Sequence, residues 1–483
     1  TGACKMKTKI IFNLIIVFLF FLCVDLLMPI SSWAACTGSS PNWSSSADYE
    51  SVNICVSGAK AGDKITVTGN AAWTNTLVIT RGIQLIGSGD PTITRKGQFI
   101  FYYPDATAQA AHDTLKISNI IFNADNATNA ELGYGGLINV NNKSATNYVY
   151  LVANNNTFKN TSGTGIYVMG RCYGVAYSNI FDRIAMPIRN MGKDYISWNN
   201  EMQAYGISEN FYFEDNTIQF SSSWPAGNAG WLETGQGGRI VVRYNTWDLT
   251  NAAAPGEFWD IHGLQGGAAI PGPYEGTCTA YSTIVSEYYG NKIINQVNAY
   301  RWMYHRGGWM LMFYNTLTGN TNPGNEITQY YCNSCQPTGS FNQNPENTYA
   351  WRNLSNGTEK PLVFRSSLVT SPGCESNPLL ENTDFFNYNA SFNGMGGIGC
   401  GTLANRPTHC TVGVGYWATN QSCSDLTGMV GKNPATPISG TLYKCTTTDT
   451  WTAYYTPYQY PHPLRESSLN VISAPSNLHL VNN

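Results

Sequence analysis

Several short segments of this chain carry charged and aromatic residues just ahead of a glycine. The segments are 166–170, 188–192, 231–235, 259–263 and 302–307. Carboxylates and imidazoles of the kinds found there transfer protons, and guanidinium groups neutralise acidic substrates. The residues that we predict to be catalytic are Glu233, Asp260, His262, His305 and Arg306.

A second set of residues in the same segments is predicted to bind substrate. Indole faces pack against sugar rings, and the planar fork of an arginine orients a carboxylate. Two structural alternatives stay open, because a histidine beside a glycine is common in turns and stacked tryptophans also fill cores. The predicted substrate-binding residues are Arg189, Trp231, Trp259 and Trp302.

If these segments are neighbouring parallel strands, equivalent residues lie ~4.8 Å apart on one face. A lyase acting on a uronic-acid polymer then becomes feasible. His262, His305 or Arg306 would remove the proton beside the carboxylate. Arg189 would neutralise that carboxylate.

A hydrolase is the other reaction that these residues suit. Glu233 and Asp260 would be paired carboxylates about 5 Å apart, which is nearer the retaining than the inverting separation. A register slip of one residue would turn either group into the interior instead.

These segments need a framework that stacks them, and a repeated asparagine predicts one. An apolar residue follows each asparagine closely, and the shortest steps of the series are 23 and 24 residues, a period typical of solenoids. Asparagine tolerates left-handed turns, and in register its amides could form a ladder through the interior. Hairpin signals are scarce, which disfavours a β-sandwich or a propeller. The series is Asn119, Asn156, Asn179, Asn216, Asn245, Asn291 and Asn315.

Composition agrees with a strand-rich chain. Apolar residues make up 42% and charged residues 12% of the 483 residues, while Gly (47) and Tyr (30) are abundant. Such a composition favours strands and turns over long helices. The net charge of −3 indicates neither nucleic acid nor an anionic membrane surface as a partner.

Residues 6–35 are predicted to be a secretion signal peptide. Met6, Lys7 and Lys9 precede a mainly apolar run over 10–28, and small residues suited to cleavage follow near Ala35. A permanent transmembrane anchor is the alternative. We therefore expect a secreted or cell-surface protein, extracellular or periplasmic, with no membrane span once the signal is removed.

Eleven cysteines follow that segment, and several disulfides are expected in a secreted chain. Their odd number leaves one cysteine unpaired, or lipidated if Cys36 becomes the N-terminus. Cys332 and Cys335 are spaced for a local disulfide, for half a zinc site or for a redox pair. We favour the disulfide, because no second pair with this spacing accompanies them.

The repeat pattern fails after about residue 375. We therefore predict a parallel β domain over 36–375 and a cysteine- and aromatic-rich appendage over 376–483. The appendage is expected to pack on, or to cap, the last turns, because the apolar end of a solenoid needs covering.

At this point the chain resembles the pectin-lyase-like family of right-handed single-stranded parallel β-helix proteins. The segments 61–67 (AGDKITV) and 83–89 (IQLIGSG) look like the opening turns of that family. The segments 238–246 (GRIVVRYNT) and 306–308 (RGG) look like its central turns. The resemblance covers residues 50–370 and is closest to secreted bacterial β-helix-repeat proteins; it implies an all-β fold.

The same fold hosts pectate, pectin and alginate lyases, polygalacturonases, epimerases, tailspikes and adhesins, so it does not choose a function. The clustered acids of a calcium pectate-lyase site are not evident here, and neither are the motifs of polygalacturonases. Calcium stays open as a cofactor, and no residue is assigned as a metal ligand.

The sequence predicts a monomeric, secreted, carbohydrate-active protein. It would cleave or bind an acidic polysaccharide in a groove along one parallel sheet. The alternative is a non-catalytic adhesin-like protein of the cell surface or matrix, whose polar residues would scatter around the coil. The two hypotheses differ in whether the predicted catalytic side chains converge.

Overall fold

The computed structural model describes residues 35–192, 203–223, 230–252, 257–263, 265–266, 278–296, 299, 301–319, 323–328, 344–365 and 379–465. The predicted signal peptide, except residue 35, and the predicted domain boundary at residue 375 lie outside these ranges. Within them the chain is all-β, with α2 (Tyr49–Gly58), α3 (Ala106–Ala110) and the 3-10 turns η2 (Leu403–Asn405) and η3 (Pro463–Arg465) as its helices.

One long sheet, sheet A, has thirteen strands. From β2 onward every pairing in it is parallel. Across the sheet the strands are β1 (Cys36–Ser39), β2 (Asn42–Ser46), β3 (Lys64–Thr68), β6 (Gln84–Ser88), β9 (Thr114–Ser118), β12 (Val149–Asn154), β14 (Cys172–Tyr177), β16 (Phe211–Glu214), β19 (Arg239–Arg243), β24 (Val285–Tyr289), β27 (Trp309–Phe313), β30 (Glu346–Trp351) and β34 (Phe385–Asn387).

A second long sheet consists of two parallel ladders, here named B1 and B2. Ladder B1 contains β4 (Ala71–Ala72), β7 (Thr92–Thr94), β10 (Ile121–Ala127), the first parts of β13 (Thr157–Gly170) and β15 (Ile180–Met191), β17 (Thr217–Gln219), β20 (Thr246–Asp248), β25 (Lys292–Gln296), β28 (Thr316–Gly319) and β31 (Leu354–Ser355). Ladder B2 contains β5 (Leu77–Ile79), β8 (Ile100–Tyr102), β11 (Gly136–Asn142), the second parts of β13 and β15, β18 (Leu232–Gly235), β21 (Glu257–Ile261), β26 (Arg301–His305), β29 (Gly324–Ile327) and β33 (Leu362–Phe364).

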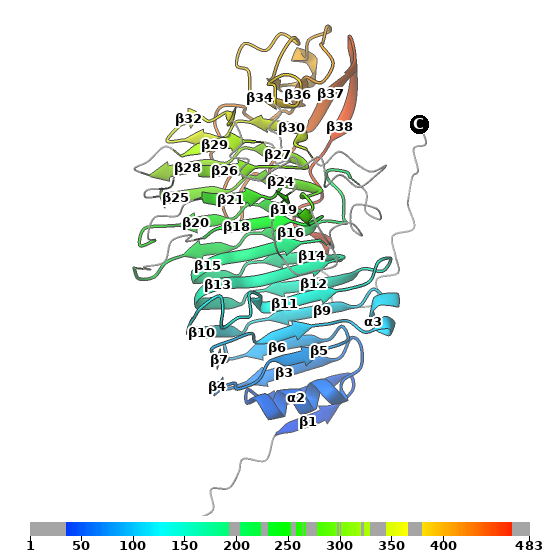
Figure 1. Ribbon diagram of the computed structural model, residues 1–483, viewed down its shortest axis with the longest axis vertical. Helices are drawn as coiled ribbons and strands as arrows, with labels where there is room; N and C mark the ends of the chain where they lie inside the picture. The colour runs from blue at the N-terminus through cyan, green and yellow to red at the C-terminus, as the bar shows by residue number, and fades with distance from the viewer. Residues whose placement is uncertain are drawn as a thin grey trace, which may run out of the picture.

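The chain visits sheet A, ladder B1 and ladder B2 in that order and then repeats the circuit one strand further along. Thus β19, β20 and β21 are followed by β24, β25 and β26, and then by β27, β28 and β29. The short antiparallel pair β22 (Gln265–Gly266) and β23 (Cys278–Ala280) lies in one connection. Each strand pairs with its counterpart from the next circuit, so the strands form a tower with α2 near one end (Figure 1). These pairings confirm the parallel stacking that the repeat predicts.

The interior of the tower is a packed apolar core that runs through successive circuits. Phe122, Phe158 and Phe181 stack with ring centroids 5.4 and 4.9 Å apart. Since each circuit lays its apolar face on the next, no single circuit is stable alone.

Seven asparagines form a hydrogen-bonded ladder where the chain turns from sheet A into ladder B1. The side-chain amides of the first six donate to the side-chain oxygen of the next asparagine at 2.9–3.1 Å. Each also donates to a backbone carbonyl of sheet A. These bonds confirm the amide ladder predicted for the repeated residue. Its members are Asn156, Asn179, Asn216, Asn245, Asn291, Asn315 and Asn353.

Two details differ from the sequence-based expectation. Asn119 lies outside the ladder, because the backbone amide of Ile120 takes the corresponding position and donates to Asn156. The left-handed residue is the one before each ladder asparagine, for example Tyr244 (φ 56) and Tyr314 (φ 51). The asparagine is therefore selected for its amide, and the turn strain falls on its predecessor.

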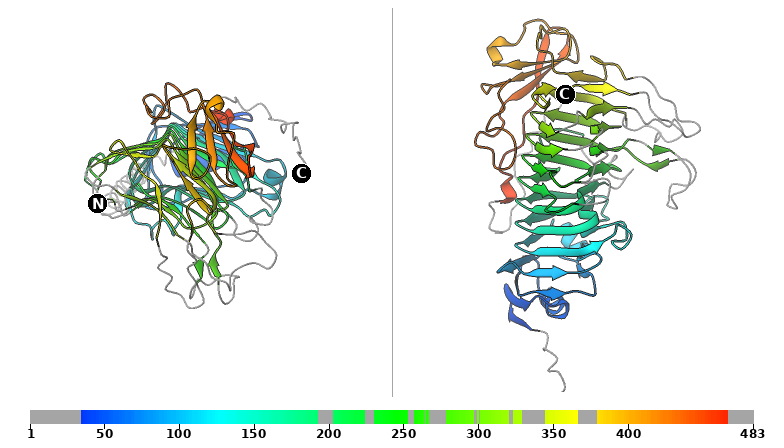
Figure 2. Two further views of the ribbon diagram at one scale, coloured as in Figure 1. Left: turned by 90° about the horizontal axis from the view of Figure 1, so that it is seen from above. Right: turned by 90° about the vertical axis from the view of Figure 1, so that its left-hand side faces the viewer.

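The C-terminal part has its own sheet of β35 (Ile398–Gly401), β36 (Gly415–Ala418), β37 (Thr441–Thr447) and β38 (Thr450–Tyr455). It lies at the end of the tower opposite α2, and the segment after β38 returns along the outer side of the tower to η3 (Figure 2). Trp417 of β36 packs against Phe313 and Trp351 of sheet A, with centroids 5.4 and 5.3 Å apart. The predicted appendage thus covers the outer face of sheet A.

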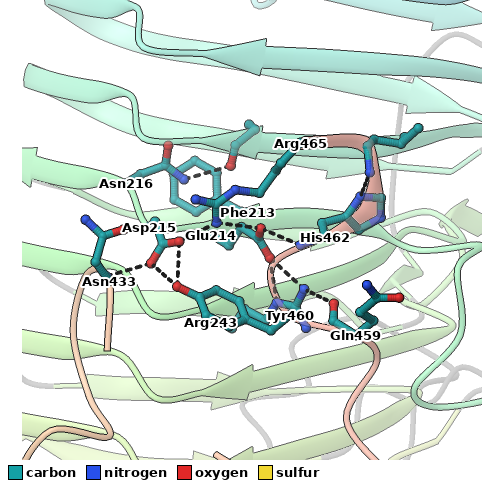
Figure 3. A network of polar contacts seen from close by, with 12 residues as sticks. Phe213, Glu214, Asp215, Asn216, Arg243, Asn433, Gln459, Tyr460, His462 and Arg465 are labelled. Atoms are coloured by element: carbon teal, nitrogen blue, oxygen red, sulfur yellow. Dashed lines mark hydrogen bonds and ion pairs between the residues drawn. The ribbon is translucent and has the colours of Figure 1, made fainter. Parts of the chain in front are cut away.

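Buried charges tie this returning segment to sheet A (Figure 3). Arg243 and Glu214 form an ion pair at 2.6 Å, and both side chains are fully buried. Arg465 contacts Glu214 at 2.9 Å and also pairs with Asp215. The Tyr460 hydroxyl donates to Asp215 at 2.8 Å. Every charge in this network has a partner of opposite sign, as buried ions require.

Disulfides hold both ends of the described chain. Cys36 is bonded to Cys55, which ties β1 to α2, so the alternative of a lipidated Cys36 is wrong. Cys400–Cys423 and Cys410–Cys445 cross-link the C-terminal part. Among the described residues Cys172 is free and buried. Cys332 and Cys335 lie outside the described residues, and no helix in the described ranges has the length and apolarity to cross a membrane.

Candidate functional site

Register places Arg189, Glu233 and Asp260 side by side on successive strands of ladder B2. Arg189 of β15 pairs with Glu233 of β18, which pairs with Asp260 of β21. Side chains alternate between the two faces of a strand, and the neighbours Trp259 and Ile261 lie in the apolar core. Asp260 and its column therefore face outward from the tower.

Glu233 is held by two cations. Arg189 Nε lies 2.8 Å from Glu233 Oε2, and Arg189 Nη2 donates to Oε1 at 3.0 Å. His262 Nε2 lies 3.1 Å from the same Oε1. Arg189 also sits over the ring of Tyr167, 5.3 Å from its centroid. The carboxylate is therefore fixed between an arginine and an imidazole.

Asp260 is held in the same manner from the other side. Arg306 Nη2 donates to both of its carboxylate oxygens at 2.6 Å, and Arg306 Nε donates to Oδ1 at 3.1 Å. His262 Nε2 lies 3.1 Å from Asp260 Oδ2. One imidazole nitrogen thus bridges Glu233 and Asp260, whose contacting oxygens are at most about 6 Å apart; the carboxyl groups of an inverting pair are more widely separated.

Two of the three cationic side chains of the cluster are more exposed to solvent than its carboxylates. The side chains of Arg189 and His262 are 25% and 18% exposed. Those of Glu233, Asp260 and Arg306 are 6%, 3% and 7% exposed. A ligand approaching this face would therefore meet Arg189 and His262 first.

The charge states follow from these contacts. Burial alone raises the pKa of Glu233, but the hydrogen bond and charge of His262, with the charge of Arg189, outweigh it and lower that pKa. Burial of Asp260 is likewise outweighed by the charges of His262 and Arg306, so its pKa is lowered. Both carboxylates are therefore ionised at neutral pH.

His262 shifts in the opposite direction. Burial by itself lowers its pKa, but the charge of Asp260 and the hydrogen bonds with Asp260 and Glu233 outweigh burial, and the pKa is raised. The raised pKa favours the charged imidazolium; when His262 is charged, three cations surround two anions and the cluster has an excess of positive charge.

Four residues of the same face were not singled out by the sequence. Arg301 pairs with Glu257 at 3.3 Å and with Glu326 at 2.6 Å. The ring of Tyr304 lies beneath Arg301 and Arg306, 4.0 and 4.8 Å from their guanidinium carbons. The sequence did contain a signal for them. Arg301 and Tyr304 have the same spacing as Glu257 and Asp260, and they pair with those two residues in register.

His305 is not part of the cluster, and its predicted catalytic role is wrong. It pairs in register with the core residues Ile261 and Ile327 and is fully buried. Its Nε2 contacts Thr348 Oγ1 at 3.0 Å, and burial lowers its pKa to about 3. Aligning the strands by their tryptophans put the register one residue out, because Trp259 pairs with Met303 and not with Trp302.

Trp259 and Trp302 are likewise inward, so their predicted contact with substrate is wrong. Both are fully buried and pack on each other with ring centroids 6.1 Å apart. Trp231 is half-buried, two residues before Glu233 and so on the outward face. Arg189 and Trp231 are thus the predicted substrate-binding residues that the fold leaves on the surface.

Metal binding finds no support in the described ranges. They contain no group of three or more His, Cys, Asp or Glu side chains placed to hold an ion. No residue is therefore assigned to calcium.

Three comparisons with known proteins complete the description of the site. No protein-family model, no curated protein and no solved structure matches the chain. The site is therefore interpreted from its own geometry.

Proposed function

We propose that this chain is a secreted protein that binds an acidic polysaccharide on the outer face of ladder B2. The observation that carries the proposal is the convergence of Arg189, His262 and Arg306 on Glu233 and Asp260. Four of the five predicted catalytic residues lie in this one cluster, whereas an adhesin-like rod without a ligand site would leave them scattered.

We also propose that the fold is a right-handed single-stranded parallel β-helix. Support comes from the fixed order in which the chain visits sheet A, ladder B1 and ladder B2. The asparagine ladder gives further support, because it needs one equivalent turn per circuit. Secretion is supported by the three disulfides of the described chain.

The positive charge of the cluster favours an anionic ligand. Arg189 and His262 are the accessible cations of the cluster; because Nε and Nη2 of Arg189 already pair with Glu233, the charge of these groups would attract a ligand carboxylate. Uronic acids carry one carboxylate on each sugar ring. A polymer of them would therefore present a charge to Arg189 and a ring face to the half-buried Trp231.

Binding is favoured over hydrolysis by the protonation states. A retaining hydrolase needs one of its two carboxyl groups protonated as a general acid. The pKa values of Glu233 and Asp260 are both lowered, so neither holds a proton at neutral pH. A lyase needs an unprotonated base, and the raised pKa of His262 disfavours that form.

A polysaccharide screen tests this proposal. The purified chain would be titrated with pectate, alginate and glycosaminoglycans, with a neutral glucan as the control. Binding would be followed together with reducing ends and the absorbance of unsaturated products. We expect salt-sensitive binding of at least one acidic polymer, no binding of the glucan, and no increase in reducing ends. Absence of binding to every acidic polymer would reject the proposal, and unsaturated products would replace it with a lyase.

A further inference from the structure

The outer face of ladder B2 continues past Arg189 toward the N-terminus and becomes aromatic. In register after Arg189 come Tyr167 of β13, Asn139 of β11, Phe101 of β8 and Val78 of β5. The column that holds Glu233 and Asp260 therefore has an uncharged half.

A second column runs beside the first. Asn141, Met169, Met191 and Gly235 pair in sequence across β11, β13, β15 and β18. At one end, a Cβ built on Gly235 would lie 2.9 Å from His262 Cβ, so the column leads to the charged cluster. At the other end is Tyr103, which directly follows β8. Because Tyr102 pairs with Val140, Tyr103 is the residue that corresponds to Asn141.

The aromatic end is open to solvent. Val78 is 51% exposed and Tyr103 is 36% exposed, although apolar side chains of this size are usually covered. The rings of Phe101 and Tyr103 stack at 5.9 Å with an angle of 26° between their planes. They form a stacked ring pair, here named the platform, and sugar rings pack on exposed aromatic surfaces of this kind.

A cation lies over one ring of this platform. Lys143 Nζ lies 5.1 Å from the ring centroid of Tyr103. An ammonium group beside an exposed ring pair suits a ligand that is both ring-shaped and negatively charged. The platform is much smaller than the ~800 Å² per partner of a stable protein interface, which favours a sugar over a protein.

Between the two ends the exposed path shifts from the second column to the first, because Met191 and Gly235 of the second column are buried. Asn139 is only 5% exposed, because Gly135 and Gly136 lie close over it: a Cβ built on Gly135 would lie 2.7 Å from Asn139 Oδ1, and Gly136 and Asn139 hydrogen-bond each other at 2.8 and 3.0 Å. Asn141 and Met169, in contrast, are both partly exposed. A ligand can therefore pass from Tyr103 over Asn141 and Met169 to Arg189.

We propose that Tyr103, Phe101 and Lys143 form a second contact region for the same acidic polysaccharide chain that the Arg189–His262 cluster binds. The inference rests on the proposed function. The polymer lies along the tower, across the strands, with ring stacking at one end and carboxylate pairing at the other. Five interstrand steps separate Tyr103 from His262, which is a span of about 24 Å.

Length dependence is the direct consequence of two linked contacts. An oligomer that reaches both regions gains from the second contact at a high effective concentration, whereas a short one does not. Affinity therefore rises with chain length until the oligomer spans about 24 Å and then levels off.

The experiment compares uronate oligomers of defined length, from disaccharide to dodecasaccharide, prepared from the acidic polymer that the wild-type chain binds. Titrations use the wild type, Tyr103→Ala, Tyr103→Phe and Arg189→Ala, with Leu403→Ala as a control on the exposed surface of the C-terminal part. We expect Tyr103→Ala to weaken dodecasaccharide binding by about two- to tenfold and to leave disaccharide binding unchanged. Tyr103→Phe keeps the ring and should retain the wild-type affinity.

The outcomes separate the two proposals. If no uronate oligomer of any length binds the wild type, the proposed function fails and this inference fails with it. If the wild type binds and Arg189→Ala weakens binding, but affinity is independent of length and Tyr103→Ala behaves like Leu403→Ala, this inference alone is overturned.

Discussion

At the scale of residues, the site depends on one imidazole nitrogen. His262 Nε2 lies 3.1 Å from carboxylate oxygens of both Glu233 and Asp260. Those contacts stabilise two neighbouring carboxylates on one face. Because the imidazole can gain or lose a proton, the net charge of the cluster depends on pH.

Ligand affinity is predicted to fall as pH rises. The folded-state pKa of His262 is raised above its ordinary value, so its positive charge and the stability it contributes are present at low pH and are lost as pH rises through the raised pKa. Titration of the acidic polymer from about pH 5 to about pH 9 would therefore show weakening above the usual histidine pKa of about 6.5. His262→Gln should flatten this profile; a wild-type profile that is already flat would contradict the assignment.

Asp260→Ala is predicted to destabilise the fold. It leaves the buried Arg306 and the partly exposed His262 without their common carboxylate, and breaking a buried pair such as Arg306–Asp260 costs about 3–5 kcal/mol. Denaturant unfolding would measure the change, with Glu209→Ala on an exposed position expected to cost about 0.5 kcal/mol or less. Equal effects of the two substitutions would show that the cluster contributes no stability.

The sequence predicted this cluster well but not the whole set of residues. Glu233, Asp260, His262 and Arg306 were found because parallel stacking brings equivalent positions together. His305 and Trp302 were misassigned because the sequence alignment set Trp302 opposite Trp259. In the structure, β26 pairs with β21 one residue further along, and Met303 lies opposite Trp259. Periodicity fixes which segments are neighbours, whereas pairing register depends on backbone hydrogen bonds that a single sequence does not reveal.

At the scale of elements, the asparagine ladder determines how each circuit joins the next. Asn245 accepts from the backbone and side-chain amides of Asn216, and it donates to Asn291 and to the carbonyl oxygen of Phe213. All of these groups are buried, so none of them can turn to water instead.

Asn245→Ala is therefore predicted to lower the free energy of unfolding by at least about 2 kcal/mol, since it leaves several buried polar groups unpaired. Asn70→Ala is the matched control, because exposed Asn70 accepts a single hydrogen bond from Thr92. The control should lose about 1 kcal/mol or less. A loss that small for Asn245→Ala would mean that the ladder is not a source of stability.

At the scale of the whole molecule, the C-terminal part is integral to the tower. Its boundary at residue 375 stays a prediction, and its path along sheet A could not be predicted from composition. The contacts of Arg465 with Glu214 and Asp215 join residues some 250 positions apart, and no local pattern encodes such a pairing.

Arg465→Ala is predicted to release the returning segment without unfolding the tower. Glu214 and Asp215 would lose a partly exposed cation that pairs with both, so hydrogen exchange of residues 457–465 should speed up while the strands of ladder B1 stay protected. Lys432→Ala is the control, because Lys432 contacts Thr246 through its backbone amide. Unchanged exchange at 457–465 would show that η3 is held by other contacts.

The central claim is that accessible cations of ladder B2 bind an acidic polysaccharide. Calorimetric titration of an acidic polymer into the wild type, Arg189→Gln and the control Arg406→Gln tests it most directly. Arg406 stacks on Tyr443 in the C-terminal part, away from the site. Our account predicts about tenfold weaker binding for Arg189→Gln, a loss of about 1.4 kcal/mol, and wild-type binding for Arg406→Gln. Equal binding by all three proteins would contradict it.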